Sequence, residues 1–453
     1  MLYSEIKTDQ WIKNQVEDLK LHFSEEKLYK TPVLENPEIQ NTKLYEFCKY
    51  LPKAANLHVH GGAMCTARQL FNFLKYRKDV MIDTDENHRG YLELTANKPG
   101  DSYMYLYNAL VKKVYTKDEL INAWSLKGRP SDIDIWDWFQ ILFDKLACLN
   151  GISKLCEDYF EFCYKQYIKY NIFHVEQKIM LTGTYEEAKA KVYSMINAYK
   201  RIRKTNKFFT VRLISVAMKN KKFSMEFNQN LINNTIKLSK ELKTTENKNE
   251  IDNLIIGIDL VNEEDSSRSI KDFQEILQNA KSQNSNLEFY LHAGETINTS
   301  NNEIEHAIKL NSKRIGHAYN LGNKKSLKQK IINKNICLES CPISNLYLGY
   351  CKDLRNHPAK YWASENIPYV LASDDDTFQE HTSLADDFFA AIVAWELNLS
   401  QIKQLCMNSI IYCGLNNYNK QILYSAWTEK WNTYISNHIE SQTLIIGSNK
   451  NFI

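Results

Sequence analysis

Long apolar runs, paired-cysteine motifs and a strong excess of charge are all absent from this sequence. No stretch approaches the eighteen apolar residues that a transmembrane helix requires, so we expect no membrane partner. The formal net charge is only +3 over 453 residues, and this weak charge predicts no binding to nucleic acid. The ten cysteines form no CxxC pattern, which favours reduced structural thiols over a disulfide framework or a metal knuckle.

Length and composition fit one large folded unit with additional segments. The chain is 43% hydrophobic and 25% charged, which is typical of a soluble globular protein. Met1 to Lys20 has the pattern of an amphipathic helix and lacks the apolar core of a secretory signal. We expect a helical extension over residues 1–50, a main domain over residues 51–440 and a tail over residues 441–453. We also expect a cytoplasmic setting, or export without a cleaved signal peptide.

Eight short apolar or β-branched runs alternate with helical patterns along the main domain. The expected strands are Ala55 to His60, Asn171 to Ile179, Phe208 to Val216, Leu254 to Val261, Leu287 to His292, Arg314 to His317, Asn335 to Glu339 and Pro368 to Ser373. Helical patterns follow them, for example over Ser269 to Gln283, Asn302 to Leu310 and Ser383 to Leu397. A strand and a helix repeated eight times predict an α/β fold, a (β/α)8 barrel of TIM type.

Two stretches lie outside this repeat. More than a hundred residues separate the first two expected strands, so the segment of about 77–130 has the character of an insertion, with a helical lid or small subdomain expected over Tyr103 to Tyr115. Two or three helices are expected from Ser400 to Ile453, where Trp427, Trp431 and Tyr434 recur at helical spacing. Aromatic residues in such a pattern usually serve packing.

Histidines and carboxylates recur where the expected strands end. His58 and His60 alternate in a strand, so both imidazoles point to one side and could meet one metal ion. His292 to Glu295, His317 and Ser373 to Asp375 follow later strands, at the barrel end that carries active sites. Three neutral imidazoles and one carboxylate suit Zn²⁺ and leave a position for water, which indicates a hydrolytic site. A packed core histidine or a solvated helix cap is the competing interpretation of each motif taken alone.

These motifs carry a family resemblance. The segments Leu57 to His60, His292 to Thr296, Arg314 to His317 and Ser373 to Asp375 resemble the adenosine deaminase superfamily. Three further segments resemble its growth-factor branch, which includes the second adenosine deaminase of animals: Cys341 to Asn345, Asp353 to Pro358 and Met407 to Ser409. The similarity extends from about Leu51 to Ile439. Members of the branch dimerise through N-terminal helices, so the resemblance implies a homodimer formed through the helical residues 1–50.

The resemblance implies a ligand set, an acid and a base. By it, one zinc ion per chain would be bound by His58, His60, His292 and Asp374. Asp375 and His317 would orient a water and take its proton, and a protonated Glu295 would face N1 of the purine. The implied reaction is hydrolytic deamination of adenosine or 2′-deoxyadenosine to the 6-oxopurine nucleoside and ammonia.

The sequence departs from the branch where the ribose should bind. Gly61 and Gly62 stand where an Asp normally follows the HxH pair, and Met218-Lys219 stands where an Asp-His pair is usual. Losing a carboxylate and gaining a cation favours a 5′-phosphorylated substrate such as AMP or ATP as an alternative, with Gly backbone amides near the phosphate. Candidate phosphate partners are Lys219, Lys178 and Arg68.

Further substrate contacts are expected, and two other functions remain open. Asn262 replaces a Gly whose backbone amide contacts the purine, Glu264 follows in the same segment, and Trp138 matches an aromatic residue that stacks near the nucleoside. One other function is a receptor-binding growth factor with a vestigial site. The other is an amidohydrolase acting on another ring, such as a pterin or guanine, although Glu295 favours a ring nitrogen like N1 of adenine.

Overall fold

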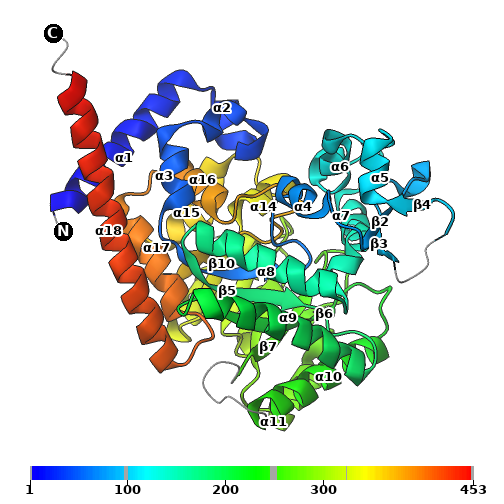
Figure 1. Cartoon of the computed structure of the whole chain (residues 1–453). Coiled ribbons are helices and arrows are strands. Elements are labelled where there is room, and N and C mark those ends of the chain that lie inside the picture. Colours follow the sequence, from blue (N-terminus) through cyan, green and yellow to red (C-terminus); the bar gives the residue numbers. More distant parts are fainter. Residues whose placement is uncertain (1–2, 96–99, 245–252, 323, 450–453) are drawn as a thin grey trace.

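A parallel barrel forms the centre of this computed structural model, which describes residues 3–95, 100–244, 253–322 and 324–449. Its eight strands are hydrogen-bonded in the order β1-β5-β6-β7-β8-β9-β10-β11 (Figure 1). They are β1 (Ala54–His60), β5 (Ile172–Ile179), β6 (Thr210–Met218), β7 (Ile255–Val261), β8 (Glu288–Ala293), β9 (Arg314–His317), β10 (Cys337–Ser340) and β11 (Tyr369–Leu371). Every expected strand is confirmed with both bounds within two residues.

The two ends of the sheet meet beside the histidine pair. Val59 of β1 forms a parallel bridge with Asp374, just beyond β11. The backbone N–H of His60 donates to the Asp374 carbonyl over 3.0 Å, and the Asp374 N–H donates to the His58 carbonyl over 3.1 Å. This junction places a carboxylate from one end of the sheet directly against the histidines from the other end.

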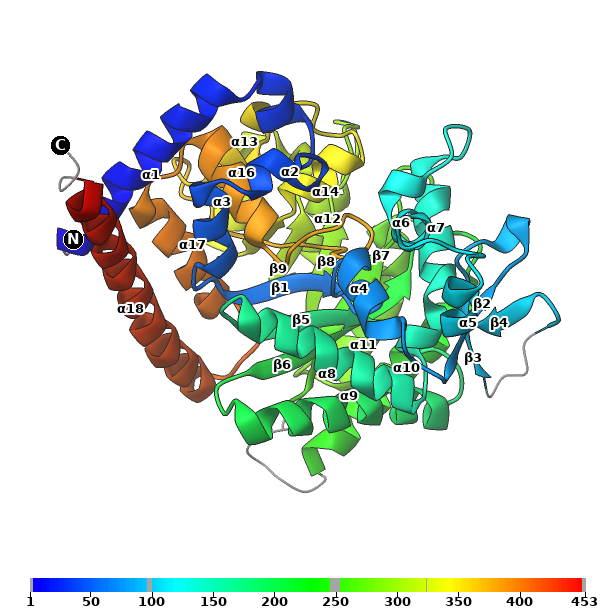
Figure 2. The same cartoon turned by 45° about the horizontal axis from the view of Figure 1, so that its top comes forward.

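Helices surround the barrel (Figure 2). In chain order they are α4 (Ala67–Leu74), α7 (Ile135–Lys145), α8 (Lys154–Lys169), α9 (Tyr185–Thr205), α10 (Met225–Thr244), α11 (Gln274–Gln283), α12 (Glu303–Lys309), α13 (Lys325–Asn333), α14 (Pro342–Tyr347), α15 (Ala359–Trp362), α16 (Ala385–Trp395) and α17 (Leu399–Ile411). Local sequence determines where several helices begin. Thr184 and Glu187 form a capping box at the start of α9, and Asn398 and Gln401 form one at the start of α17. The three helical stretches expected after strands are confirmed, the first beginning as a 3-10 turn before α11.

The terminal helices lie together along one side of the barrel (Figures 1 and 2). The N-terminal extension contains α1 (Tyr3–His22), α2 (Pro37–Gln40) and α3 (Lys43–Tyr50), and the chain ends in α18 (Asn417–Asn449), which packs against α1. Trp427 and Trp431 are buried on α18, in agreement with a packing role. Because α18 runs through residue 440, the expected boundary between domain and tail does not coincide with a break in secondary structure.

The inserted segment forms a small antiparallel sheet beside the barrel (Figure 1). Its strands β2 (Val80–Asp83), β3 (Leu92–Leu94) and β4 (Tyr103–Tyr105) pair in the order β3-β2-β4, and helices α5 (Leu106–Val111) and α6 (Lys117–Ala123) follow. Tyr103 to Tyr115 is thus part strand and part helix, as in a small subdomain. Among the described residues, no helix has both the length and the apolar character needed to cross a membrane.

Candidate active site

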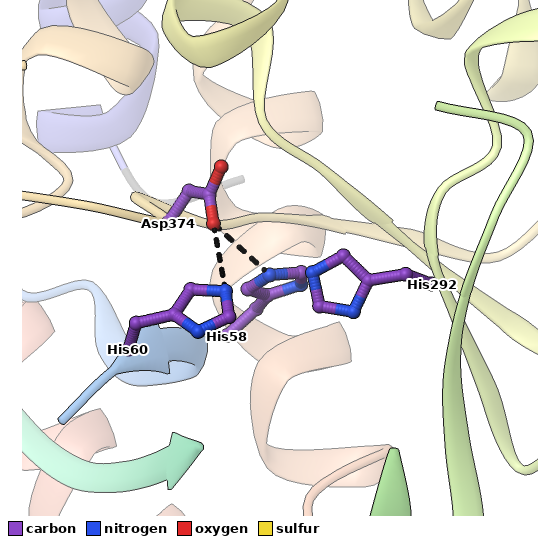
Figure 3. A group of neighbouring side chains, drawn as sticks. All are labelled: His58, His60, His292 and Asp374. Atoms are coloured by element: carbon purple, nitrogen blue, oxygen red, sulfur yellow. Dashed lines mark ion pairs between the residues drawn. The ribbon is translucent and has the colours of Figure 1, made fainter. Parts of the chain in front are cut away.

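Three histidines and one aspartate converge at the carboxyl ends of the barrel strands (Figure 3). His58 and His60 come from β1, His292 from β8, and Asp374 from the turn after β11. One carboxylate oxygen of Asp374 lies 3.2 Å from Nε2 of His58 and 3.2 Å from Nε2 of His60. One potential ligand atom from each of the four residues lies within 4.8 Å of all the others. Such a donor set is typical of a metal site in barrel hydrolases, and its three nitrogens and one oxygen fit Zn²⁺.

Two carboxylates that the sequence reasoning passed over hold two of these imidazoles in place. Nδ1 of His58 lies 2.7 Å from Oε2 of Glu339, and Nδ1 of His292 lies 2.7 Å from Oδ2 of Asp259. An imidazole that donates through Nδ1 presents the lone pair of Nε2, which is the form that binds a metal. Both carboxylates lie on expected strands, so their position near the strand ends was the available signal.

Three more titratable side chains border this cluster: Glu295, His317 and Asp375. Nε2 of His317 lies 3.4 Å from Oε1 of Glu295. Burial is the main cause that raises the pKa of Glu295, and the nearby Asp374 carboxylate adds to it. Burial also lowers the pKa of His317 well below its ordinary value. Both shifts favour the uncharged form, which is a protonated carboxyl for Glu295 and a neutral imidazole for His317.

Cys341 lies closer to the cluster than its expected role as a structural thiol implied. Ligand atoms of Cys341, His58, His317 and Asp374 lie within 4.8 Å of one another, and all four residues are buried. Burial raises the pKa of the Cys341 thiol well above its ordinary value. The thiol donates weakly to the Glu339 carbonyl, at 3.8 Å. A neutral thiol is a poorer ligand than the imidazole of His60 or His292, so the histidine set remains the better metal site.

The backbone around Glu295 explains two residues of the His-Ala-Gly-Glu motif. Gly294 has φ +82°, and a Cβ there would lie 2.7 Å from both Oδ1 of Asn320 and Cδ1 of Ile304, so glycine is required. The N–H groups of Gly294 and Glu295 donate to Oε2 of Glu264 over 2.8 and 3.3 Å. Glu264 thus fixes the turn that carries Glu295.

A cavity of about 690 Å³ opens from this cluster toward solvent. Its walls combine acidic and histidine groups at the cluster with apolar and amide side chains farther out. Of the expected site residues, the lining includes His60, Gly61, Met218, Asn262, His292, Glu295, Asp374 and Asp375. The cavity is large enough for a nucleoside or a nucleotide.

Other expected substrate contacts fall outside the described lining of this cavity. Trp138 is buried and its indole N–H donates to the Ser125 carbonyl over 3.1 Å, whereas Trp136, two residues earlier, does line the cavity. Lys219 and Glu264 are buried behind the wall, with Nζ of Lys219 3.7 Å from Oε2 of Glu264. The stacking role of Trp138 and direct substrate contact by Lys219 and Glu264 stay predictions, since none of the three residues is among the described lining of the cavity.

The expected phosphate partners are also placed differently. Lys178 does line the cavity, but its ammonium is 2.6 Å from Asp259 inside the barrel. Arg68 is exposed on α4 and is not among the described lining residues. The N–H of Gly61 donates to the Lys178 carbonyl over 2.8 Å, so this amide is not available to a phosphate. Lys191 and Lys222, which the sequence reasoning did not select, line the cavity instead.

Fold and site together define the class of protein. A parallel eight-stranded barrel with three histidines and an aspartate at the carboxyl ends of β1, β8 and β11 has the architecture of amidohydrolase-type barrel enzymes.

Comparison with known proteins narrows this class. The family model described as Adenosine deaminase matches residues 129–429, more than half of the chain. The chain is 27% identical over 427 residues to Adenosine deaminase 2 of Dictyostelium discoideum, covering 89% of this chain and 76% of that protein. Among solved structures, the N6-methyl-AMP deaminase of Arabidopsis thaliana aligns with a TM-score of 0.62 at 18% identity, over 85% of this chain and 98% of that one. An amidohydrolase from Burkholderia ambifaria with bound Zn aligns with a TM-score of 0.60 at 14% identity, over 87% and 95%.

The chain belongs to the adenosine deaminase family, as its strand-end motifs indicated. It is a deaminase of that family, a hydrolase acting on carbon–nitrogen bonds. The two solved structures add agreement in fold.

Proposed function

We propose that this protein catalyses the zinc-dependent deamination of adenosine or 2′-deoxyadenosine, with water as co-substrate and ammonia as second product. The observation that carries the proposal is the placement of Glu295 and His317 beside the three-histidine, one-aspartate cluster at the wall of the cavity. Membership of the family supports deamination, and the relative named Adenosine deaminase 2 supports an adenine nucleoside.

One zinc ion per chain would be held by His58, His60, His292 and Asp374. When bound, the ion supplies Lewis-acid activation of water. The chemistry of the donor set fits this ion, and the related fold that was solved with bound Zn supports the choice.

Glu295 is the proton donor of the proposed reaction. Attack on C6 breaks the aromaticity of the ring and places negative charge on N1, so a proton delivered there lowers the barrier. Burial raises the pKa of the Glu295 carboxyl and so favours the protonated form that this role needs. The two N–H groups held by Glu264 fix the turn from which Glu295 reaches the ring.

His317 and Asp375 act on the water. Nε2 of neutral His317 accepts a proton as the water oxygen bonds to C6, and His317 then returns that proton to the leaving amine. The C6–N bond breaks and ammonia leaves. N1 keeps the proton from Glu295 in the 6-oxopurine product, and the proton that remains on the C6 oxygen passes to the Glu295 carboxylate and restores the acid. Oδ1 of Asp375 is buried and accepts no hydrogen bond from the described residues, which leaves it available to orient the water.

A 5′-phosphorylated adenine nucleotide is the second candidate substrate. Gly61 removes a carboxylate from the cavity wall next to His60, and Lys191 and Lys222 are among the residues that line the cavity. A carboxylate at position 61 would repel a phosphate, and its absence lifts that penalty. The Arabidopsis deaminase named for N6-methyl-AMP shows that this fold accommodates such substrates in another protein.

Ammonia release from adenosine, 2′-deoxyadenosine, AMP and ATP tests both candidates, with and without prior removal of metal. We expect turnover of the nucleosides that chelation abolishes and zinc restores. Preference for AMP or ATP would select the second candidate. Metal-dependent release from none of the four would contradict the proposal and return attention to other aminopurines or a binding role.

Glu295→Gln tests the acid directly. We expect kcat to fall by about 10²- to 10⁴-fold, the usual contribution of a positioned proton donor, with one zinc still bound per chain. Glu303→Gln is the matched control, because Glu303 is equally buried but accepts from Ser269 and Ile270 away from the cavity. Wild-type kcat in Glu295→Gln would refute the assigned role.

A further inference from the structure

Lys178 lies at the centre of a group of charged side chains inside the barrel. It is on β5, where His174, Glu176 and Lys178 alternate and therefore share the inner face. Its side chain is fully buried, with Nζ 2.6 Å from Oδ2 of Asp259 and 3.6 Å from Oε2 of Glu339. One ammonium thus contacts carboxylates from β7 and β10, on either side of the site.

The same two oxygen atoms hold the imidazoles of the metal cluster. Oδ2 of Asp259 accepts from Nδ1 of His292 over 2.7 Å, and Oε2 of Glu339 accepts from Nδ1 of His58 over 2.7 Å. Lys178 is therefore linked to each of the two imidazoles through one carboxylate, and the Nε2 atom of each imidazole faces the metal position. It reaches the two ligands through two different carboxylates.

The second oxygen atom of each carboxylate, which Lys178 does not contact, accepts hydrogen bonds from other donors. Oδ1 of Asp259 accepts from the backbone N–H groups of His292 and Leu260 over 2.8 and 2.7 Å. Oε1 of Glu339 accepts from Nε of Arg314 over 2.6 Å. In each carboxylate, the oxygen shared by Lys178 and a histidine is therefore the atom whose position depends most on Lys178.

We propose that Lys178 is a positioning residue that orders two zinc ligands, His58 and His292, at once. This inference rests on the zinc binding proposed above. Its ammonium balances two buried negative charges that would otherwise repel each other across the barrel. Balanced in this way, both carboxylates stay where they accept from Nδ1, and both imidazoles keep the lone pair of Nε2 directed at the metal. The phosphate contact expected for Lys178 is replaced by this role.

The zinc affinity of metal-free protein measures this role without any substrate. Competition with a chromophoric chelator gives the dissociation constant for zinc. We expect Lys178→Met to weaken binding by about 10- to 100-fold, the usual effect of removing an outer partner of a metal ligand. Lys53→Met is the matched control, because Lys53 is a buried lysine just before β1 whose amine donates to the backbone carbonyls of Lys49 and Leu51 over 3.0 and 3.1 Å. Its affinity for zinc should match that of the wild type.

A double-variant cycle distinguishes positioning from general destabilisation. If Lys178 acts through Asp259, the loss in Lys178→Met combined with Asp259→Asn should be smaller than the sum of the single losses. Additive losses, or wild-type affinity in Lys178→Met, would overturn the inference. Lys178→Gln repeats the test with less loss of polarity, and failure of both variants to fold would assign Lys178 a purely structural role. Absence of zinc binding in the wild type would instead overturn the zinc proposal itself.

Discussion

Replacing Arg314 with methionine should destabilise the barrel strongly. Arg314 is fully buried on β9, with Nη2 2.6 Å from Oε2 of Glu176 and Nε 2.6 Å from Oε1 of Glu339. Its guanidinium also donates to the carbonyls of Tyr412 and Leu57. Methionine fills a similar volume but leaves two buried carboxylates without this cation. The cost of breaking a buried ion pair in this way is about 3 to 5 kcal/mol.

The expected shift in melting temperature follows from the size of the chain. The entropy of unfolding is about 2.1 cal/mol/K per residue, so for 453 residues each kcal/mol lowers the melting temperature by about 1 °C. Arg314→Met should therefore melt about 3 to 5 °C below the wild type. Differential scanning calorimetry of metal-free protein measures this shift without a contribution from zinc binding.

A surface arginine with a similar number of ion pairs provides the control. Arg355 contacts Glu25 over 2.8 Å and Asp353 over 2.7 Å, but 35% of its side chain is exposed. Each exposed pair contributes about 0 to 1 kcal/mol, so losing both pairs in Arg355→Met should lower the melting temperature by about 2 °C or less. Equal shifts in the two variants would refute the reasoning, because burial would then not determine the value of an ion pair in this protein.

Two further predictions concern the cavity wall and the effect of pH on stability. Trp136→Ala should raise KM about 2- to 12-fold, because an aromatic contact with the substrate contributes about 0.5 to 1.5 kcal/mol. Trp138→Ala should leave KM unchanged and lower the free energy of unfolding by about 3 to 5 kcal/mol. An increase in KM confined to Trp138→Ala would contradict the structure. Burial raises the pKa of Asp386 to about 6 from an ordinary value of 3.8. The folded state therefore holds this proton more tightly, and its stabilising effect is complete below pH 4 and lost as pH rises to about 6. Because Asp386→Asn cannot ionise, its melting temperature relative to the wild type should increase across this window, and a constant difference would disprove the assignment.

Local pattern predicts which residues share a face, but it does not predict which face meets the cavity. Trp136 and Trp138 both lie on α7, and the sequence favoured Trp138 for stacking. The helix instead turns Trp136 toward the cavity and buries Trp138 against Ser125 and Lys145. The rotation of a helix about its axis is decided by packing with neighbours that are distant in sequence.

Local sequence is equally unable to predict which group a buried lysine contacts. A sequence shows that Lys178 and Lys219 carry cations near strand ends, but an ammonium takes its partner from whatever the fold brings within about 4 Å. For Lys178 that partner is Asp259, 81 residues away. For Lys219 the nearest carboxylate is that of Glu264, behind the cavity wall. These partners, which the sequence does not reveal, are what a phosphate would have to displace.

Motifs and periodicity were sufficient to predict the barrel and the strand that carries the histidine pair, and the family resemblance implied the four residues that the fold brings together. Two physical rules explain why the motifs meet: side chains alternate along a strand, and parallel strands end at one edge of the sheet. How the cluster is supported, by Asp259 and Glu339 behind the imidazoles and by Lys178 between them, depends on long-range contacts of the folded chain. Those contacts join β1, β5, β7, β8 and β10 across the interior of the barrel, and no local pattern encodes such distances.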